Sequence, residues 1–327
     1  MRVLVCGGAG YIGSNMTAML AAEGFEPVVF DDLSRGHKGA VRDAKFVQGN
    51  LADFALLVET LRKYGIEAVM HFAAFIEVGE SMEQPLKYYH NNVCNTRVLL
   101  AAMEEAGVEK FVFSSSAAVY GIAKEAPIKE DSAKEPINAY GETKWAIERM
   151  CHYQSLAGKV RYAALRYFNA SGAGQDGQLG EDHRPESHLI PLVIQAAMGK
   201  RKEIKVFGTD YPTPDGTCVR DYIHIEDLCR AHLLALGRLD SNSELVYNLG
   251  NGLGYSVRQV IETVKKVSGR DFKVVNVERR PGDPPVLTSD ATKAKKELGW
   301  VPKFAELESI VETAWKWHKN HPNGYEE

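Results

Sequence analysis

The sequence predicts an α/β fold in which a doubly wound parallel (Rossmann-type) sheet is accompanied by a second, smaller α/β domain. In the first half, short apolar runs rich in β-branched residues alternate with longer amphipathic stretches, which is the pattern of βαβ units. A cluster of glycines directly follows the first apolar run, and glycine, proline and aspartate become more frequent from about residue 174. We therefore expect a first domain over residues 1–173 and a second over residues 174–327, with residues 220–250 a candidate to pack back onto the first.

Six expected strands of the first half lie at residues 2–6, 27–30, 45–47, 68–72, 110–114 and 160–166. A long helix is expected over residues 84–106, because its apolar side chains recur at helical spacing, and Gly107 should end it. The expected buried face of this helix comprises Leu86, Tyr89, Val93, Thr96, Leu100 and Met103. Residues 220–237 indicate a further strand, a turn and a helix. Right-handed crossovers would wind these elements into one sheet.

The composition is that of a globular protein whose 327 residues, 45% of them hydrophobic and 25% charged, can bury a large core. A net charge of -4 without a run of five or six like charges argues against a nucleic-acid or membrane partner. Five cysteines without a Cys-x-x-Cys pair are expected to be buried free thiols, and no metal site is expected. These thiols, the lack of a membrane-length apolar run and a strand beginning within two residues of the N-terminus point to the cytoplasm.

The glycine cluster fits the pattern Gly-x-x-Gly-x-x-Gly at Gly7, Gly10 and Gly13. Glycines let the backbone turn tightly and approach a pyrophosphate, whose charge the N-terminal amides of the next helix can meet. Glycines alone are weak evidence, because turns also use them for steric reasons. Here the cluster lies between an apolar strand and a helix, which favours a dinucleotide site.

The identity of the dinucleotide depends on the end of the second strand. Asp31 lies there, eighteen residues past Gly13. A carboxylate in this place can accept hydrogen bonds from the adenosine ribose hydroxyls and would repel a 2′-phosphate, which favours NAD over NADP. Arg35 is the counter-signal, since a nearby arginine can accommodate that phosphate.

A candidate catalytic set includes Tyr140 and Lys144, four residues apart on an expected helix that Asn138 could cap. Alone, such a pair is as well explained by an amphipathic surface. The serines at residues 114–116 change this balance, because they end an expected strand, and sheets of this type place their ligands at the carboxyl ends of strands.

These residues could activate a hydroxyl group. For tyrosine to act as a base, its pKa must fall from about 10 toward 7, which corresponds to roughly 4 kcal/mol. One ammonium at about 4 Å supplies on the order of that energy in a partly screened site. Lys144 could therefore activate Tyr140, while Ser116 holds the reacting hydroxyl at hydrogen-bonding distance.

Six motifs together resemble the UDP-galactose 4-epimerases of the extended short-chain dehydrogenase/reductase family. They are GGAGYIG at 7–13, SSSAAVYG at 114–121, Tyr140-x-x-x-Lys144, RYFN at 166–169, FGTDYPTPDGTCVRDYIH at 207–224 and RRPGD at 279–283. The resemblance runs nearly from end to end, and the joint spacing of so many motifs is far more specific than any single one.

The resemblance implies an NAD-dependent UDP-hexose 4-epimerase that interconverts UDP-glucose and UDP-galactose through a 4-keto sugar, with UDP-GlcNAc and UDP-GalNAc as further candidate substrates. Tyr140 would be the base, Lys144 would lower its pKa and hold the nicotinamide ribose, and Ser116 would assist. Relatives hold NAD tightly and are commonly homodimers through helices equivalent to residues 84–106 and 138–157.

The resemblance also implies two sets of binding residues. Those near NAD are Gly7, Gly10, Tyr11, Ile12, Gly13, Asp31, Asp32, Leu33, Ser34, Asn50, Leu51, Phe72, Ala73, Ala74, Asn91, Ser114, Tyr140, Lys144, Tyr167 and Phe168. Those near the UDP-sugar are Ser116, Tyr140, Asn169, His188, Leu189, Phe207, Arg220, Tyr222, Arg280, Asp283 and Leu287. Without the resemblance, surface ion pairs or core aromatics would be the preferred explanation for all of the second set except Arg220 and Arg280.

The chain departs from the family pattern at two places, and a third position bears on the substrate range. Asn50 replaces an aspartate that receives the adenine amino group in many relatives, and Ile76 replaces a lysine that reaches the cofactor phosphates in some. Leu287 stands where some relatives close the sugar pocket with a tyrosine, and leucine leaves more room for an N-acetyl group.

Two other functions remain open. A sugar-nucleotide dehydratase or decarboxylase would share the fold and the Tyr/Lys pair, but it needs an acid where this chain has Ala117 and Ala118. A non-catalytic NAD sensor would have no use for Ser116, Tyr140 and Lys144 together.

Overall fold

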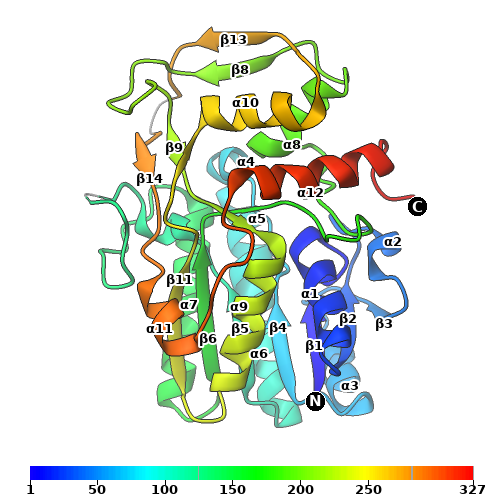
Figure 1. Ribbon diagram of the computed structural model, residues 1–327. Coiled ribbons are helices and arrows are strands. Elements are labelled where there is room, and N and C mark those ends of the chain that lie inside the picture. The colour runs from blue at the N-terminus through cyan, green and yellow to red at the C-terminus, as the bar shows by residue number, and fades with distance from the viewer. Residues whose placement is uncertain (124, 281–282, 327) are drawn as a thin grey trace.

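In the computed structural model, which describes residues 1–123, 125–280 and 283–326, a seven-stranded parallel sheet forms the base of the molecule (Figure 1). The strand order is β11-β6-β5-β4-β1-β2-β3, which confirms the predicted doubly wound fold. The bounds of these strands are β1 Arg2–Cys6, β2 Glu26–Asp31, β3 Lys45–Gln48, β4 Ala68–His71, β5 Lys110–Ser114, β6 Arg161–Tyr167 and β11 Glu244–Leu249. The last of these was not expected as a strand.

Both faces of the sheet are covered because successive strand residues point to opposite sides. Val3 and Val5 of β1 pack in one core cluster with helices α1 (Tyr11–Ala22) and α9 (Ile225–Arg238). Leu4 packs on the other face with α3 (Phe54–Lys63), α6 (Asn95–Ala106) and α7 (Ala139–Leu156). All three β1 side chains are fully buried, so the central strand is apolar on both faces.

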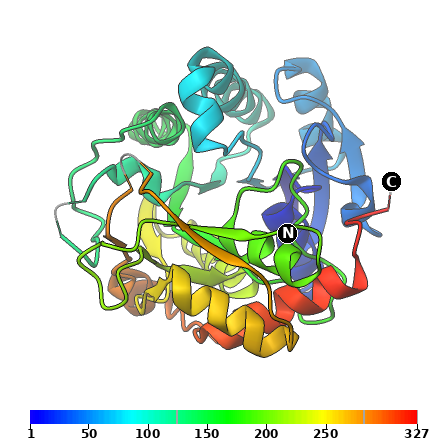
Figure 2. The same ribbon diagram turned by 90° about the horizontal axis from the view of Figure 1, so that it is seen from above.

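A second lobe sits over the carboxyl ends of the strands (Figure 1). Its core joins α8, α10 and α12 to a parallel pair of strands, β8 and β13. Figure 2, which looks onto this lobe, shows α10 and α12 on the opposite side of the molecule from α6 and α7. The bounds are α8 Leu189–Ala197, β8 Ile204–Phe207, α10 Val257–Ser268, β13 Val274–Val277 and α12 Leu307–Asn320.

Short elements connect the two lobes. β7 (Asn169–Ser171) pairs in parallel with β10 (Tyr222–His224), and β9 (Val219–Arg220) lies between β12 (Tyr255–Ser256) and β14 (Val286–Leu287). The buried carboxylate of Asp221 holds this region by accepting the N–H groups of Asn251, Gly252 and Ser289. The remaining helices are α2 Lys38–Val41, α4 Val78–Glu83, α5 Pro85–Tyr88, η1 Tyr89–Cys94, η2 Ala117–Tyr120 and α11 Thr292–Leu298.

The long helix expected over residues 84–106 is divided. A π-helical stretch, η1, separates α5 from α6, and its wider turns rotate the later buried face away from the earlier one. As a result Leu86 is 82% exposed and Tyr89 is 38% exposed, whereas Thr96, Leu100 and Met103 are buried as expected. Gly107 ends the helix in a left-handed conformation, as predicted.

The cysteine prediction is correct for four of the five thiols. All five are free, but Cys94, at the end of η1, is exposed. Among the described helices, none combines the length and the apolar character needed to cross a membrane.

Candidate active site

The predicted glycine turn follows β1 and leads directly into α1. Gly7 has φ +79°, and a Cβ there would come within 2.5 Å of the backbone nitrogen of Ala73. A Cβ on Gly13 would lie 2.1 Å from the carbonyl oxygen of Gly7. The turn therefore packs too closely for side chains at these two positions, as the pyrophosphate hypothesis requires.

The N-terminus of α1 fits an anion. Gly10 occupies the N-cap position, and no side chain of the described residues caps the helix there. The first-turn N–H groups, beginning at Tyr11 and Ile12, thus keep the capacity to bind phosphate oxygens, and the helix dipole favours negative charge at the same place. The residues present fit the dinucleotide that the sequence predicts.

Asp31 ends β2, as expected, and is 8% exposed. Its two carboxylate oxygens accept the N–H groups of Ala9 (3.0 Å) and Leu33 (2.8 Å). Burial raises the pKa of this carboxyl, and the two backbone hydrogen bonds oppose that shift. Each oxygen retains a lone pair with which to accept a ribose hydroxyl.

Neighbouring side chains extend this edge of the site. Asp32 accepts the N–H of Ser34 (2.9 Å) and the side-chain amide of Asn50 (2.7 Å), while the Asn50 oxygen accepts the N–H of Ala52 (2.9 Å). The family resemblance suggested that this Asn50 oxygen accepts the adenine amino group. It already accepts one hydrogen bond, from the backbone N–H of Ala52.

Arg35, the signal for NADP, is engaged elsewhere. It donates to the backbone oxygen of Arg184 (3.1 Å), lies 3.9 Å from a carboxylate oxygen of Glu80, and stands 5.7 Å from the centroid of the Phe75 ring. The Arg35 guanidinium therefore has partners within the protein, and its position does not require a 2′-phosphate.

The expected catalytic residues meet where β5 ends. Asn138 caps α7 by accepting the N–H of Gly141 (2.8 Å), which confirms the predicted cap. Tyr140 is 8% exposed and Lys144 is 2% exposed, and the ammonium of Lys144 lies 5.8 Å from the centroid of the Tyr140 ring. Ser116, 9% exposed, lies two residues past the end of β5, so all three side chains lie at one edge of the sheet.

The electrostatics of this set differ from the sequence expectation. Burial raises the pKa of Tyr140, and the hydrogen bond with Ser116 opposes this shift. Burial also lowers the pKa of Lys144 to about 7, against the influence of Glu148. Lys144 donates to the backbone oxygen of Ser114 (2.8 Å). Without a bound cofactor, desolvation thus outweighs the lowering of the Tyr140 pKa that Lys144 was expected to cause.

A buried ion pair behind these residues was not found from the sequence. Glu148 and Arg166 are each 3% exposed, and two guanidinium nitrogens contact the carboxylate, at distances of 2.9 Å and 2.5 Å. Ser115 donates to the same carboxylate (2.5 Å), and Arg166 donates to the hydroxyl of Tyr120 (2.8 Å). In the sequence, only the position of Glu148, four residues past Lys144 on the same expected helix, could have indicated this ion pair.

A buried asparagine was also missed. Asn92 is fully buried, accepts the N–H of Phe75 (2.9 Å), and donates to the Phe75 oxygen (3.1 Å) and to Thr143 (3.1 Å). It therefore ties the segment after β4 to α7. Its neighbour Asn91, the expected cofactor contact, donates to the Asn92 side-chain oxygen (3.0 Å).

Other expected cofactor residues line the same edge. Phe72, Ala73 and Ala74 follow β4, and Ser114 donates to the hydroxyl of Tyr167 (3.1 Å). Leu51, just after β3, is 8% exposed. The structure thus brings the predicted residues to the carboxyl ends of β1 to β6, although their contacts with a cofactor remain predictions.

Several residues expected to bind UDP converge around β9. Arg220 donates to the backbone oxygens of Val219 (2.9 Å) and Pro284 (2.8 Å), and it lies 3.3 Å from a carboxylate oxygen of Asp283. β14 pairs with β9 so that Leu287 is the register partner of Arg220. Arg220, Asp283 and Leu287 therefore lie together where β9 and β14 pair.

A second expected cation, Arg280, lies in the segment after β13, the strand that pairs with β8. The guanidinium of Arg280 stands 3.9 Å from the centroid of the Phe207 ring, at the end of β8. Asn169 donates to the backbone oxygen of Asp221 (2.8 Å). Tyr222, 3% exposed, packs within the core of the second lobe. The remaining expected residues, His188 and Leu189, begin α8, while Pro281 and Gly282 of the last motif lie outside the described residues.

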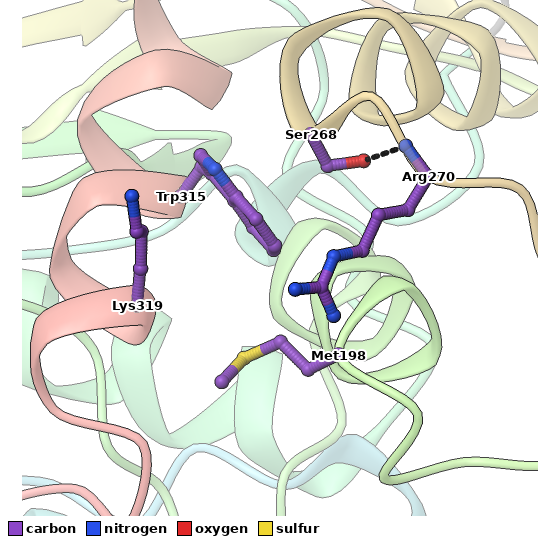
Figure 3. Close-up of a pocket in the computed structure, with 5 residues that line it drawn as sticks. All are labelled: Met198, Ser268, Arg270, Trp315 and Lys319. Atoms are coloured by element: carbon purple, nitrogen blue, oxygen red, sulfur yellow. Dashed lines mark hydrogen bonds between the residues drawn. The ribbon is translucent and has the colours of Figure 1, made fainter.

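A cavity of about 310 Å³ lies away from this edge, between the ends of α8, α10 and α12 (Figure 3). In Figure 3 the Trp315 ring and the Arg270 side chain stand on opposite sides of it. Its lining residues, Met198, Ser268, Arg270, Trp315 and Lys319, include none of the predicted site residues.

The glycine turn, the acid after β2 and the Ser-Tyr-Lys set define the class of protein as a dinucleotide-dependent enzyme of the short-chain dehydrogenase/reductase type. The chain belongs to the NAD dependent epimerase/dehydratase family, whose pattern residues 3–250 match. The match confirms the resemblance drawn from the motifs.

Individual relatives cover the whole chain. A UDP-glucose 4-epimerase of Lactobacillus helveticus is 50% identical, with 100% of both chains covered. The crystal structure of the UDP-glucose 4-epimerase from Brucella ovis in complex with NAD superposes with a TM-score of 0.94 at 49% identity, covering 96% of this chain and 97% of that one. The UDP-Glc/GlcNAc 4-epimerase of Campylobacter jejuni superposes with a TM-score of 0.87 at 44% identity, with 98% and 99% covered.

The buried pair gives a stability prediction. Glu148→Ala leaves the guanidinium of Arg166 buried and unpaired, so we expect a loss of about 3–5 kcal/mol in the free energy of unfolding. Chemical denaturation followed by circular dichroism measures it. Glu104→Ala is the matched control, because its ion pair with Lys159 (2.8 Å) is about half exposed on both sides. That change should cost less than about 1 kcal/mol, and equal losses in both variants would contradict the prediction.

Proposed function

We propose that this protein is an NAD-dependent UDP-hexose 4-epimerase that interconverts UDP-glucose and UDP-galactose by transient oxidation at C4. The observation that carries the proposal is the convergence of Ser116, Tyr140 and Lys144 at the sheet edge that also holds the glycine turn. The close relation to curated UDP-glucose 4-epimerases supports it.

Each residue of the set has a role in this chemistry. NAD would supply the hydride acceptor and, when bound, a positive ring beside the tyrosine. Tyr140 takes the proton of the 4-hydroxyl as the C4 hydride leaves, and it returns that proton when the 4-keto sugar is reduced on the opposite face. Ser116 holds the sugar oxygen within reach of the Tyr140 phenol, and Lys144 stabilises the phenolate of Tyr140. The low exposure of Tyr140 and Lys144 keeps water away from the proton transfer.

The nucleotide part of the substrate is assigned to the second lobe. Arg220 and Arg280 suit the charge of a diphosphate, and the ring of Phe207 suits a uracil face. We assign NAD binding to residues 1–173 and UDP binding to residues 174–327, with α9 and β11 of the segment 220–250 packed on the first part.

Assembly and location complete the proposal. Met82, Leu86 and Tyr89, on and beside α4 and α5, expose apolar surface, as does Leu156 at the end of α7, and a second copy of the chain could cover them as a homodimer. Five free cysteines suit the reducing conditions of the cytoplasm.

The dehydratase alternative lacks an acid. Ala117 is 5% exposed and, with Ala118, opens η2 directly after Ser116, where a dehydratase needs a carboxyl group. The nearby carboxylate of Glu148 is committed to Arg166. Incubation of the purified protein with UDP-galactose, without added NAD, tests the choice. UDP-glucose identified by NMR supports epimerisation, a 6-deoxy-4-keto product would show dehydration, and no turnover would favour a sensor.

The cofactor prediction concerns the purified protein. Because the cycle consumes no NAD and Asp31 would accept its ribose hydroxyls, we expect the protein to retain NAD through purification. The protein is denatured and the released nucleotide is identified by an enzymatic assay. Release of NADP would show that Arg35 outweighs Asp31, and release of neither nucleotide would contradict tight binding.

The base is tested by Tyr140→Phe. Removal of the hydroxyl should lower kcat by about 10²–10⁴-fold, the usual range for a lost general acid–base group. The affinity for the UDP-sugar should stay near wild type, because the ring retains its packing. Tyr153→Phe on the same helix is the control, since that side chain is 61% exposed. A parallel loss of turnover and affinity in Tyr140→Phe would indicate a structural role instead.

The substrate range is tested at Leu287, which packs against the buried cluster that contains Ala117 and Tyr120 beside the catalytic edge. Because leucine is smaller than tyrosine, we expect the wild type to interconvert UDP-GlcNAc and UDP-GalNAc as well. Leu287→Tyr should abolish that activity and spare UDP-galactose turnover, whereas Leu287→Met should retain both. Wild-type protein that yields no product from UDP-GlcNAc would contradict the prediction.

A further inference from the structure

The tail of the described chain, residues 321–326, packs against the segment that follows β2. Tyr325 makes this contact, because its ring stacks on the ring of His37 with the centroids 5.3 Å apart and the planes inclined by 27°. Tyr325 is 9% exposed. In Figures 1 and 2 the red tail leaves α12 and runs to the blue part of the chain that contains α2. The tail is therefore in direct contact with residues 33–42, the segment after β2.

The carboxylate of Asp182 joins these two segments to the connection between β7 and α8. Its Oδ2 atom accepts the N–H of Tyr325 (3.1 Å) and lies 3.3 Å from the Nε2 atom of His37. The same His37 nitrogen lies 3.0 Å from the backbone oxygen of Asp182, and it must carry the proton because a carbonyl oxygen can only accept. Gly324 has φ +78°, and a Cβ there would clash with the Asp182 carboxylate. The tail thus approaches Asp182 too closely for a side chain at position 324.

The hydroxyl of Tyr325 provides a further attachment. It accepts the N–H of Gly180 (3.0 Å) and donates to the Gly180 oxygen (3.1 Å). On its apolar side, the Tyr325 ring lies 4.7 Å from the ring of Trp317, which is 1% exposed. Both the polar and the apolar parts of the side chain have partners, so the tail holds the ring in one place.

The segment of residues 33–42 adopts a costly backbone conformation. Leu33 and Arg42, at its two ends, have φ angles of +60° and +54°. In the part of the chain that the structure describes, no other non-glycine residue has a positive φ. This conformation is unfavourable for a residue with a Cβ and persists where the surrounding structure holds it. His37 lies between the two, so its contacts with Tyr325 and Asp182 help to hold the segment.

His37 is also bonded to the expected cofactor site. Its N–H donates to the backbone oxygen of Ala9 in the glycine turn (2.9 Å), and the N–H of Ala9 donates to Asp31 (3.0 Å). The other carboxylate oxygen of Asp31 accepts the N–H of Leu33 (2.8 Å). A displacement of His37 would therefore disturb both the glycine turn and the carboxylate expected to bind the adenosine ribose.

We propose that Tyr325 is a positioning residue for NAD, whose ring, stacked on His37, holds residues 33–42 in the conformation that receives the adenosine ribose. The inference rests on the proposed function, because it takes Asp31 as the ribose-binding residue. Without the stacked ring the segment could relax, and NAD binding would then have to include the ordering of this segment.

The rate at which bound NAD exchanges tests the proposal. Purified holoenzyme is mixed with an excess of isotopically labelled NAD, and the replacement of the bound nucleotide is followed by mass spectrometry. The temperature is one at which circular dichroism shows every variant to be folded. Exchange should be about 10-fold faster in Tyr325→Ala, as expected for the loss of an aromatic contact and of its hydrogen bonds. Exchange at the wild-type rate would overturn the proposal.

Two matched variants separate positioning from stability. Ile310→Ala removes a fully buried side chain of α12 from a core cluster that contains none of residues 33–42, so it should lower Tm and leave NAD exchange near the wild-type rate. Equal acceleration in Ile310→Ala and Tyr325→Ala would assign the effect to stability and refute the proposal. Tyr325→Phe keeps the stacked ring and should exchange close to the wild-type rate. Exchange as fast as in Tyr325→Ala would exclude the stack as the contact responsible.

A variant cycle tests whether Tyr325 acts through His37. His37→Ala removes the other partner of the stack and should also accelerate NAD exchange. Because both changes break one contact, the double variant should exchange no faster than the faster of the two single variants. Effects that multiply would show that the two side chains act independently, which contradicts the proposal.

Hydrogen exchange reports on the segment itself and does not depend on turnover. Peptides that contain residues 33–42 should exchange faster in the Tyr325→Ala holoenzyme than in the wild type, because the His37 N–H would lose its fixed position beside Ala9. Unchanged protection would overturn the proposal. Wild-type protein that neither retains nor binds NAD would instead contradict the proposed function, so the two failures give different results.

Discussion

The buried ion pair between Glu148 and Arg166 is the constraint on which the catalytic edge depends. It joins α7, which carries Tyr140 and Lys144, to β6, and through Ser115 it also holds the end of β5. Two charges buried this deeply are tolerated only when their hydrogen-bonding capacity is satisfied from several sides. Helix and strand are therefore held in one relative position, because any slip would leave a charge without its partner.

The same arrangement explains the electrostatics of the site. Because α7 is held against the sheet, Tyr140 and Lys144 are almost fully buried, and desolvation dominates the pKa of each. The neutral forms of both side chains are thus favoured in the protein alone. A positive charge supplied with the cofactor would shift the balance toward the phenolate, so the chemistry is coupled to cofactor binding by burial itself.

The second lobe follows a different design, in which short pieces of chain are tied by backbone contacts. The carboxylate of Asp221 collects three N–H groups from two separate loops, and this places β9 and β14 side by side. Arg220 and Leu287 are consequently register partners on these two neighbouring strands.

The sequence by itself determined the features that depend on neighbouring residues. The glycine turn, Asp31 at the end of β2 and the Asn138 cap follow from backbone sterics and local hydrogen bonds, which operate over a few positions. Tertiary structure decided the rest. The π-helical turns of η1, the pairing of Glu148 with Arg166 and the convergence of the Glu181 and His188 side chains all depend on packing between segments. Their energies arise only when distant parts of the chain exclude water together, and no local pattern encodes that.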